Sequence, residues 1–531
     1  MNTTRALKGL LAAGLIASCA ANAMAQGTQR IDPAKARVIE HWTAERRANA
    51  IPRDLVIDPR GLGYLRGRGG VLEPYGHSVA AQTAEKAREP TPSPFGKPGG
   101  GTDSTGATSA PVISDMNPDS GRVIGSSYTF SAVVTDPEGI RSVTFRIWKG
   151  ASTSKQSFSA SKAAGTDVWS VPLRGFTDGN DWRWDVVAKD ASGKGGVTST
   201  STAVTFTVKT GDSSSTGTGT GTPVVANDPW TDKASPIYKA AGRLYFEMPR
   251  NAKRSSWTGY VCSGTVVNDG VTGTGADAVP RPGSRILTAA HCIYDDANKA
   301  FARNVMFIPQ QADAGPTDLN CNNDPIGCWA PSYGVVDLQW TNKTFPNNVK
   351  WDYGFYVVSD TGVHTISSTK PVVSDALDSA AGALAITFGA VAHDVAANNS
   401  DRTHALGYSY SEDPKFMYCA EDMAASATVN WENWWLGSCG LSGGSSGGPW
   451  IQPMSETTAT DGTTIKSGPI ISVNSWGYTT LPGMAGPRLD SSATAQAVFA
   501  CAVADRALPG TLVNGGDEGV IVSGSSCAQQ W

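Results

Sequence analysis

The chain has 531 residues, of which 17% are charged, and its formal net charge is −4 at pH 7. This length exceeds that of one ordinary domain, so we expect two or three domains. The weak negative charge argues against nucleic acid or an acidic lipid surface as a partner. Glycine, serine and threonine are abundant, and we expect strands to outnumber helices.

The first 25 residues have the three parts of an export signal. Arg5 and Lys8 supply positive charge, an apolar stretch follows at 9–17, and the small residues Ala23 and Ala25 form a cleavage site. A lipoprotein-type processing site ending in Cys19 is the alternative. We favour soluble export, to the extracellular space or a periplasm, because Ile and Ser are second-choice residues in such a site. No later apolar run is long enough to span a bilayer, so we expect no membrane span.

Residues 26–90 form a charged N-terminal region. The stretch 34–50 has a helical pattern, and a Gly/Arg-rich stretch follows at 61–70. Two interpretations are open: the region is a propeptide, or it is an ordered arm that stays attached. The next stretch, 91–110, is rich in Pro, Gly, Ser and Thr, which predicts a linker.

The sequence pattern of residues 111–209 predicts an independent β-domain. Apolar residues alternate in runs at 128–134, 143–147, 182–188 and 204–208, and turn-forming sequences separate these runs. Short alternating strands at this spacing predict a β-sandwich, and the region resembles bacterial immunoglobulin-like domains. We expect a spacer or chaperone-like module, with a surface or carbohydrate ligand on exposed aromatic residues as an alternative. A second linker, rich in Gly, Ser and Thr, follows at 210–224.

Ser446 lies in the most informative stretch of the chain, the run of glycines and serines at 443–448. Cys439 precedes the run and Pro449 follows it, so the surroundings differ from those of the linkers. Glycines here allow a tight turn whose N–H groups point into a small concavity. A serine hydroxyl at that point can attack a carbonyl carbon while the N–H groups of Gly444 and Ser446 stabilise the oxyanion. Such a nucleophile requires a base.

Two upstream stretches supply the partners of a nucleophilic serine. His291 follows the apolar run 286–290, and Asp352 stands at the head of a buried-looking strand at 353–358. The order His, Asp, Ser along a chain is one known order of a catalytic triad. We predict His291 as general base toward Ser446, and Asp352 as the carboxylate that holds the imidazole and stabilises its charged form. The rival residues are Asp337, Asp360, Ser442 and Ser445.

Four motifs occur in a specific order: LTAAHC at 287–292, DYGFYVV at 352–358, GGSSGGP at 443–449 and SWG at 475–477. Together they resemble the trypsin/chymotrypsin superfamily, and within it the secreted bacterial branch that includes glutamyl-endopeptidase-like enzymes. The resemblance covers roughly the last 300 residues. It implies an all-β fold in which a chymotrypsin-like double β-barrel, residues 225–531, follows the immunoglobulin-like β-sandwich. It also implies acyl-enzyme hydrolysis of polypeptide substrates with no cofactor and no metal ion.

The resemblance assigns further roles around the predicted nucleophile. Ser475, Trp476 and Gly477 would form one wall of the primary pocket and pair with the substrate backbone as an added strand. The opposite wall would run through Gly440. The segment 41–47, HWTAERR, is similar to one found ahead of the catalytic domain in this branch, where it belongs to a propeptide.

The chain has nine cysteines, and removal of Cys19 with the export signal would leave eight. Eight cysteines can pair in about 105 ways. We predict that each cysteine forms a disulfide with the next cysteine along the chain. The resemblance supports the pair Cys262–Cys292 in particular. Metal binding by cysteines is the alternative, against which the lack of a C-x-x-C motif and of His clusters argues. The predicted pairs are Cys262–Cys292, Cys321–Cys328, Cys419–Cys439 and Cys501–Cys527.

Some positions depart from the family pattern. Trypsin-type enzymes have an aspartate where this chain has Ser445, and they use it to bind a newly formed N-terminus. We therefore expect any latency to come from the N-terminal region covering the cleft. Glutamyl-specific relatives have a histidine where Asn474 lies. Asp490, close to Arg488, is another candidate for the pocket, and the side-chain preference stays open.

The sequence thus predicts a secreted serine endopeptidase. The alternative from another class is a protease-fold binding protein or adhesin that acts through the immunoglobulin-like module. An esterase with the same residues is a third reading, and it is disfavoured because α/β-hydrolase esterases place the serine before the other two triad members.

Overall fold

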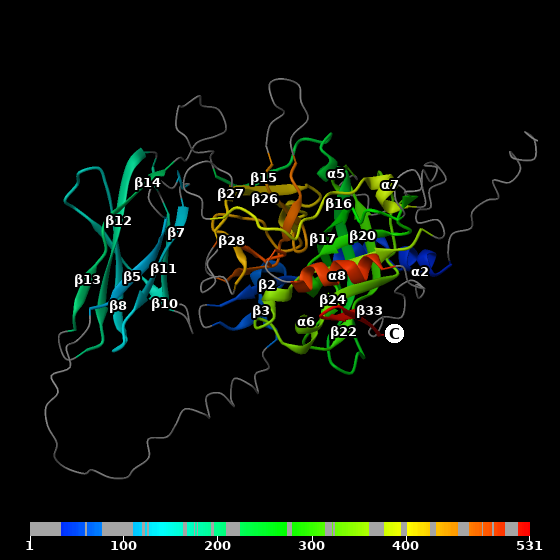
Figure 1. Ribbon diagram of the computed structural model, residues 1–531, viewed down its shortest axis with the longest axis horizontal. Helices are drawn as coiled ribbons and strands as arrows, with labels where there is room; N and C mark the ends of the chain where they lie inside the picture. Colours follow the sequence, from blue (N-terminus) through cyan, green and yellow to red (C-terminus); the bar gives the residue numbers. More distant parts are fainter. Residues whose placement is uncertain are drawn as a thin grey trace, which may run out of the picture.

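The computed structural model of the chain (Figure 1) describes residues 33–58, 61–76, 110–118, 123–124, 127–162, 167–174, 176–177, 179–192, 196–208, 224–272, 279–313, 321, 324–360, 376–393, 401–424, 432–454, 467–479, 482–490, 493–504 and 519–530. The predicted export signal lies outside these ranges, as do the two predicted linkers except for Ala110 and Val224.

The described chain is mostly β, with its strands arranged in several sheets and with short helices. The prediction that strands outnumber helices is therefore confirmed. Each sheet has an open strand order within the described ranges. In the same ranges, no helix is long and apolar enough to cross a membrane.

The described residues between 110 and 208, called the two-sheet region below, form two sheets that share one apolar core. Phe130 lies between them, with its ring centroid 5.0 Å from that of Trp184 and 5.4 Å from that of Phe206. Alternation along the strands directs these side chains inward, as the sequence pattern predicts. The first sheet has the order β10 (Ser161–Lys162), β11 (Val168–Arg174), β7 (Ser127–Thr135), β5 (Val112–Asn117). The second has the order β6 (Val123–Ile124), β14 (Val204–Val208), β12 (Gly179–Asp190), β8 (Ile140–Lys149), β9 (Gln156–Ser159), with β13 (Thr198–Thr200) beside β12.

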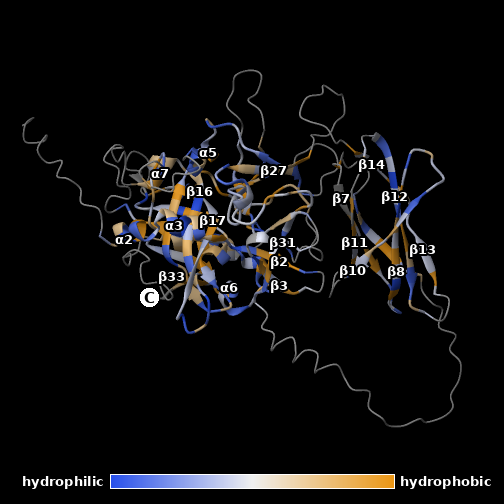
Figure 2. Ribbon diagram, turned by 180° about the vertical axis from the view of Figure 1, so that it is seen from behind, coloured by the Kyte–Doolittle hydropathy of each residue, from blue (hydrophilic) through white to orange (hydrophobic). Residues whose placement is uncertain are grey.

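The remaining described residues form a larger body around a nine-stranded sheet. Figure 2 shows hydrophobic residues gathered on β16, β17 and their neighbours in the interior of this body. The sheet has the order β23 (Arg303–Pro309), β16 (Ala241–Pro249), β17 (Trp257–Val267), β20 (Ser284–Thr288), β25 (Gly354–Val358), β24 (Tyr333–Asp337), β33 (Gly519–Ser523), β34 (Ser526–Gln530), with β1 (Ile51–Pro52) beside β17. The helix α8 (Ala493–Val503) packs on β24, β25 and β33 of this sheet.

Two further sheets complete this body, with β-hairpins and short helices around them. One has the order β15 (Val225–Pro229), β27 (Met417–Asp422), β26 (Arg402–Gly407), β29 (Pro449–Ile451), β30 (Ile470–Val473). The other has the order β28 (Trp434–Leu436), β32 (Met484–Gly486), β31 (Trp476–Tyr478), β2 (Asp54–Ile57), β3 (Gly63–Arg66), β4 (Leu72–Pro74). The hairpins pair β18 (Val271–Thr272) with β19 (Val279–Pro280) and β21 (Tyr294–Asp295) with β22 (Ala300–Phe301). The short helices include α5 (Pro236–Ala240), α6 (Leu338–Asn342), α7 (Leu377–Ala381), η1 (Arg68–Gly70), η4 (Gln311–Asp313) and η6 (Tyr410–Glu412).

The N-terminal segment 33–76 is packed into the larger body. The predicted helix at 34–50 is two helices, α2 (Pro33–His41) and α3 (Ala44–Asn49), because Thr43 caps α3 through a bond from Arg46 N–H to its Oγ1. Between the helices, the Trp42 indole donates to the Asn304 carbonyl at 2.5 Å and packs on the ring of Tyr245. The described residues of this segment, called the arm below, are therefore packed against the larger body.

The same segment adds strands to two sheets. β1 pairs in parallel with β17, and β2 pairs in parallel with β31, with Leu55 opposite Trp476 and Val56 opposite Gly477. Leu55 and Ile57 are fully buried and belong to the main apolar core. The arm therefore crosses from one sheet to the other, between β17 and β31.

The predicted cysteine pairing is confirmed. All four disulfides lie in the larger body and join cysteines that are neighbours in the sequence. They are Cys262–Cys292, Cys321–Cys328, Cys419–Cys439 and Cys501–Cys527. These disulfides fit a protein of an oxidising, extracellular environment.

Candidate active site

His291 lies in the turn η3 (Ala290–Cys292), directly after the fully buried strand β20. The Cys262–Cys292 disulfide fastens the next residue to β17. His291 is itself buried; its backbone N–H donates to Asp352 Oδ1 at 2.8 Å and its Nδ1–H to Asp352 Oδ2 at 2.7 Å. The Nε2 atom has no hydrogen-bond partner among the residues that the structure describes. The ring is thus held so that Nε2 can accept a proton.

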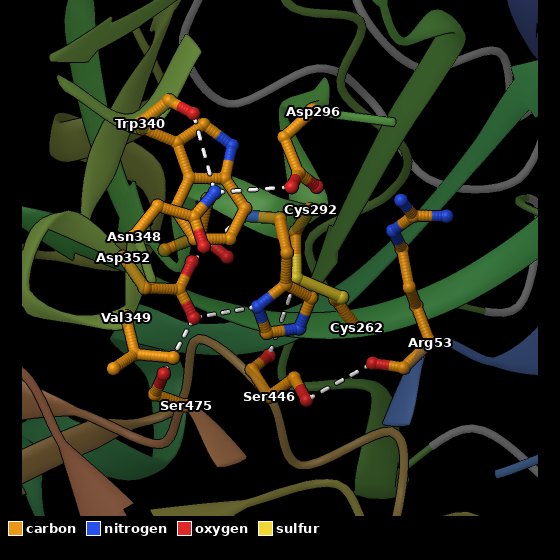
Figure 3. A network of polar contacts seen from close by, with 12 residues as sticks. Arg53, Cys262, Cys292, Asp296, Trp340, Asn348, Val349, Asp352, Ser446 and Ser475 are labelled. Carbon is orange, nitrogen blue, oxygen red and sulfur yellow. Dashed lines mark hydrogen bonds and ion pairs between the residues drawn. A yellow bond between two sulfur atoms is a disulfide. The ribbon is translucent and has the colours of Figure 1, made fainter. Parts of the chain in front are cut away.

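Asp352 lies between the turn η5 (Val349–Trp351) and β25. Besides the two bonds from His291, its Oδ2 accepts a hydrogen bond from Ser475 Oγ at 2.5 Å. Figure 3 shows Ser475 and Asp352 beside each other. Three donors therefore satisfy a carboxylate that is fully buried. The Ser475 hydroxyl thus orients Asp352, a role that the sequence did not indicate, and the part of Ser475 in a pocket wall stays a prediction.

A second polar network fixes the turn that carries Asp352. Asn348 Nδ2 donates to Asp296 Oδ2 at 3.1 Å and to the Trp340 carbonyl at 3.2 Å, as Figure 3 shows. Asn348 and Asp296 are both buried. These bonds tie η5 to the loop that follows His291, so they hold the two halves of the His–Asp pair in register. No motif in the sequence indicated this role.

Ser446 lies in a loop that requires glycine at several positions. A Cβ atom on Gly447 would lie 2.0 Å from Thr288 Oγ1, and the backbone there has a φ of 81°. Gly444 has a φ of 96°, which also favours glycine. The Ser446 carbonyl accepts a hydrogen bond from Ser263 N–H at 2.7 Å, which pins the loop to β17. The loop therefore has a fixed conformation, unlike a linker.

The N–H groups of Gly444 and Ser446 donate to no acceptor among the described residues, whereas the neighbouring N–H groups of Ser445 and Gly447 bond to protein carbonyls. Two such groups on either side of one residue can bind an oxygen that becomes negatively charged. Ser445 itself is buried, and its Oγ has no hydrogen-bond partner among the described residues.

The Ser446 hydroxyl does not bond to His291 in this structure. It donates instead to the carbonyl oxygen of Arg53 at 3.3 Å, as Figure 3 shows. Arg53 N–H donates in turn to the Val261 carbonyl of β17 at 3.2 Å. The arm thus lies directly over the serine and leaves it only 5% exposed. The oxygen of Arg53, rather than its carbonyl carbon, faces the nucleophile, which is not an arrangement for attack.

Asp54, the next residue of the arm, lies close to the same site. A Cβ atom on Gly443 would lie 2.7 Å from Asp54 Cβ. Burial raises the pKa of Asp54 to about 6, although Arg66 and His291 lower it. Arg66 Nη1 lies 3.7 Å from Asp54 Oδ2. The arm thus brings one acidic residue against the candidate site in a largely buried position.

The other residues predicted to bind substrate are arranged as follows. Trp476 and Gly477 belong to β31, whose edge is covered by β2 of the arm. Gly440 is exposed, and its N–H donates to the Ala226 carbonyl of β15. Arg488, close to Asp490 in the sequence, stacks on the ring of Trp434 at 4.3 Å.

Among the residues that the structure describes, three groups of side chains have donor atoms close enough for a metal ion. Two of them consist largely of cysteines that are in disulfides, which removes their thiolates. The third is Asp136, Glu138 and Asp190, at turns of the two-sheet region. It lies on elements remote in sequence from the triad, and exposed acidic groups of this kind are common without an ion.

No family model matches this chain, and no curated protein matches it.

Proposed function

We propose that this protein is a secreted serine endopeptidase held latent by its own N-terminal segment. One observation carries the proposal: a buried His–Asp pair lies beside Ser446, and among the described residues neither His291 Nε2 nor the N–H groups of Gly444 and Ser446 have a hydrogen-bond partner. Surface histidines and linker serines do not have this arrangement. The four ordered motifs and the resemblance to the trypsin/chymotrypsin superfamily, with its double β-barrel, support the same class.

The residues can perform acyl transfer as follows. With a peptide in place of the arm, His291 Nε2 accepts the Ser446 proton while Oγ bonds to the carbonyl carbon. The N–H groups of Gly444 and Ser446 stabilise the oxyanion. Asp352 stabilises the imidazolium, which then donates its proton to the leaving amine. A water molecule repeats the sequence on the acyl-enzyme and releases the acid.

Latency follows from the position of the arm. Ser446 is bonded to the Arg53 carbonyl, and β2 occupies the edge of β31 to which a substrate backbone would pair. The arm is anchored far from the site as well, by buried Trp42 and by Arg47, whose Nη1 lies 3.5 Å from Asp324. A substrate must therefore displace a segment with its own apolar core contacts.

The experiment is labelling with a serine-directed fluorophosphonate in a chain whose arm is weakened by Leu55→Asp. Leu55 is fully buried, so its removal costs about 2 kcal/mol of docking free energy and the new charge adds to this loss. We expect Leu55→Asp to label at least about tenfold faster than the unchanged chain, since 1.4 kcal/mol gives a factor of ten. The label should map to the peptide that carries Ser446.

Leu72→Asp is the matched control, because Leu72 lies on the same arm but is 40% exposed. It should label at the rate of the unchanged chain. Adding Ser446→Ala to Leu55→Asp should abolish labelling. Absence of labelling in Leu55→Asp would contradict the proposal and favour a protease-fold binding protein or adhesin.

For residues 111–209 we propose an immunoglobulin-like spacer module. Two sheets around an aromatic core support this reading. No aromatic side chain is exposed in the described part of this region, so nothing there favours the carbohydrate ligand, which stays a prediction.

A further inference from the structure

The side chain of Arg53 fills a buried acidic pocket next to the candidate nucleophile. Its Nη2 lies 3.3 Å from Asp295 Oδ2 and donates to Tyr75 Oη at 2.7 Å. The guanidinium carbon lies 5.1 Å from the ring centroid of Tyr260 and 5.1 Å from that of Tyr75. Tyr75 Oη donates in turn to Asp296 Oδ1 at 2.5 Å. Two carboxylates and two rings thus surround one cation.

These residues come from two separate parts of the chain. Arg53 and Tyr75 belong to the N-terminal arm, whereas Asp295, Asp296 and Tyr260 belong to the body that carries the triad. When the arm leaves, the cation and one ring leave with it. The two carboxylates and the Tyr260 ring remain as a pocket with no cation in it.

The fold holds both carboxylates in place without the arm. Asp295 Oδ1 accepts N–H bonds from Ala297 at 3.0 Å and Asn298 at 2.8 Å. Asp296 Oδ2 accepts the N–H of Phe345 at 2.7 Å. The surrounding loops thus hold both carboxylates, while Asp295 Oδ2 also faces Arg53 and Asp296 Oδ1 also faces Tyr75. Burial raises the pKa of Asp296, and Asp295 adds to this effect, so a cation between them is favourable.

The pocket lies within one residue of the reacting position. The backbone of Arg53 bridges β17 and Ser446. Its N–H donates to the Val261 carbonyl of β17, and its carbonyl accepts from Ser446 Oγ. Under the proposed function, β31 pairs with the acyl half of a substrate. Along the arm, Arg53 N–H meets β17, the Arg53 carbonyl meets Ser446, and Leu55 meets β31, so β31 lies beyond Ser446 from β17. A substrate residue on the β17 side is therefore the one that follows the cleaved bond.

We propose that Asp295, Asp296 and Tyr260 form a substrate subsite that selects lysine or arginine at the first or second position after the cleaved bond. The inference rests on the proposed function. Arg53 leaves its Nε without a partner among the described residues, so the pocket does not require the full guanidinium geometry and an ammonium group also fits. In the latent chain, Arg53 occupies the subsite in place of a substrate.

The test uses the whole chain with a recognition sequence for a site-specific protease placed within residues 81–109. Cutting there keeps every part present and lets the arm dissociate on dilution. The cut protein is incubated with a complex peptide mixture, and mass spectrometry reads the residues on each side of every cleaved bond. We expect Lys and Arg to be enriched about tenfold at one of the two positions after the bond, the factor that 1.4 kcal/mol gives.

The variant Asp295→Asn/Asp296→Asn keeps the oxygens that accept the loop N–H bonds but removes both charges. It should lose the enrichment while preferences before the bond stay the same. Asp337→Asn, which removes a buried carboxylate that caps α6 at the end of β24, should leave the whole profile unchanged.

The outcomes separate the inference from the function on which it rests. Cleavage without Lys or Arg enrichment in the unchanged sequence overturns the subsite, as does enrichment that survives in the double variant. Fluorophosphonate labelling without any cleavage also overturns it. Absence of both labelling and cleavage overturns the proposed function itself.

Discussion

The two-sheet region and the larger body bury charge to very different extents. In the first, an aromatic core centred on Phe130 and Trp184 excludes charge, and the buried exceptions among the described residues are Asp185 and Asp190. In the larger body, buried charged residues include Arg53, Asp295 and Asp352. An apolar core suffices for a stable fold, and burial of unpaired charge is costly. Buried charge in the larger body therefore requires partners, and among these pairs the proposed function gives a chemical role to His291 and Asp352.

Even the buried charge of the two-sheet region has a structural explanation. Asp185 accepts from Arg146 and from Lys155 at 2.7 Å each. Burial acts to raise the pKa of Asp185, but these hydrogen bonds outweigh it and the pKa is lowered. The two cations are partly exposed, so this cluster is a surface ion pair with one buried end. The His291 and Asp352 pair, in contrast, is buried at both ends.

The largest expected effect comes from replacing a buried aspartate by asparagine in each of the two regions. In the chain cut within 81–109, Asp352→Asn should lower the rate of peptide hydrolysis about ten-thousandfold, because the imidazole loses its tautomer control and its counter-charge. Asp185→Asn removes a comparable buried carboxylate and should leave the rate unchanged. Steady-state kinetics on one peptide measures both. Equal effects from the two variants would remove the distinction between the regions.

A smaller effect concerns the pH dependence of arm docking. Burial raises the pKa of Asp54 from 3.8 to about 6, so the docked arm holds this proton more tightly than the free arm. The affinity of the arm for the body is then highest below pH 3.8, falls as the pH rises, and reaches its minimum above pH 6. The dissociation constant of the arm changes about a hundredfold over this range. Arm dissociation is measured by fluorescence anisotropy in the cut Ser446→Ala protein, where no chemistry interferes.

Asp54→Asn should make the affinity of the arm independent of pH between pH 4 and pH 7. The affinity should stay close to the low-pH value of the unchanged chain, because asparagine is uncharged like the protonated aspartate. The groups that act on Asp54 are Arg66 of the arm and His291 of the site. If the profile of Asp54→Asn keeps the same slope, the titration belongs to another group and the account of docking is wrong.

The smallest effect concerns the hydroxyl that supports Asp352. Ser475→Ala removes the donor at 2.5 Å and should lower the hydrolysis rate about tenfold, since a bond to a charged group is worth roughly 1.5–3 kcal/mol. Ser475→Thr keeps the donor and should recover most of the rate. A loss in Ser475→Ala that appears only in KM would instead support a role in substrate binding.

Much of the candidate site could be predicted because its residues lie in short motifs. His291, Asp352 and Ser446 each stand beside a run of glycine, cysteine or apolar residues whose spacing carries information, and the structure brings His291 and Asp352 into contact. The neighbour pairing of cysteines was also predictable, because every loop that they close is short. The alternating runs predicted the strands of the two-sheet region for the same local reason.

Contacts between distant segments could not be predicted. The four residues of β2, Asp54–Ile57, form an ordinary short apolar strand, and nothing in them indicates β31 as the partner some 420 residues later. The position of Asp295 beside Arg53 is likewise set by the path of the arm. The bond from Ser475 to Asp352 was also missed, because a motif gives the position of a residue but not the direction of its side chain.

The most direct measurement is the mass of the intact chain after exposure to a fluorophosphonate, before and after cutting within residues 81–109. The account predicts little labelling before the cut and one label per chain, on Ser446, after the cut and dilution. Labelling that is equally fast before the cut would show that the arm does not cover the serine. No label on Ser446 in either state would contradict the assignment of this residue as a nucleophile.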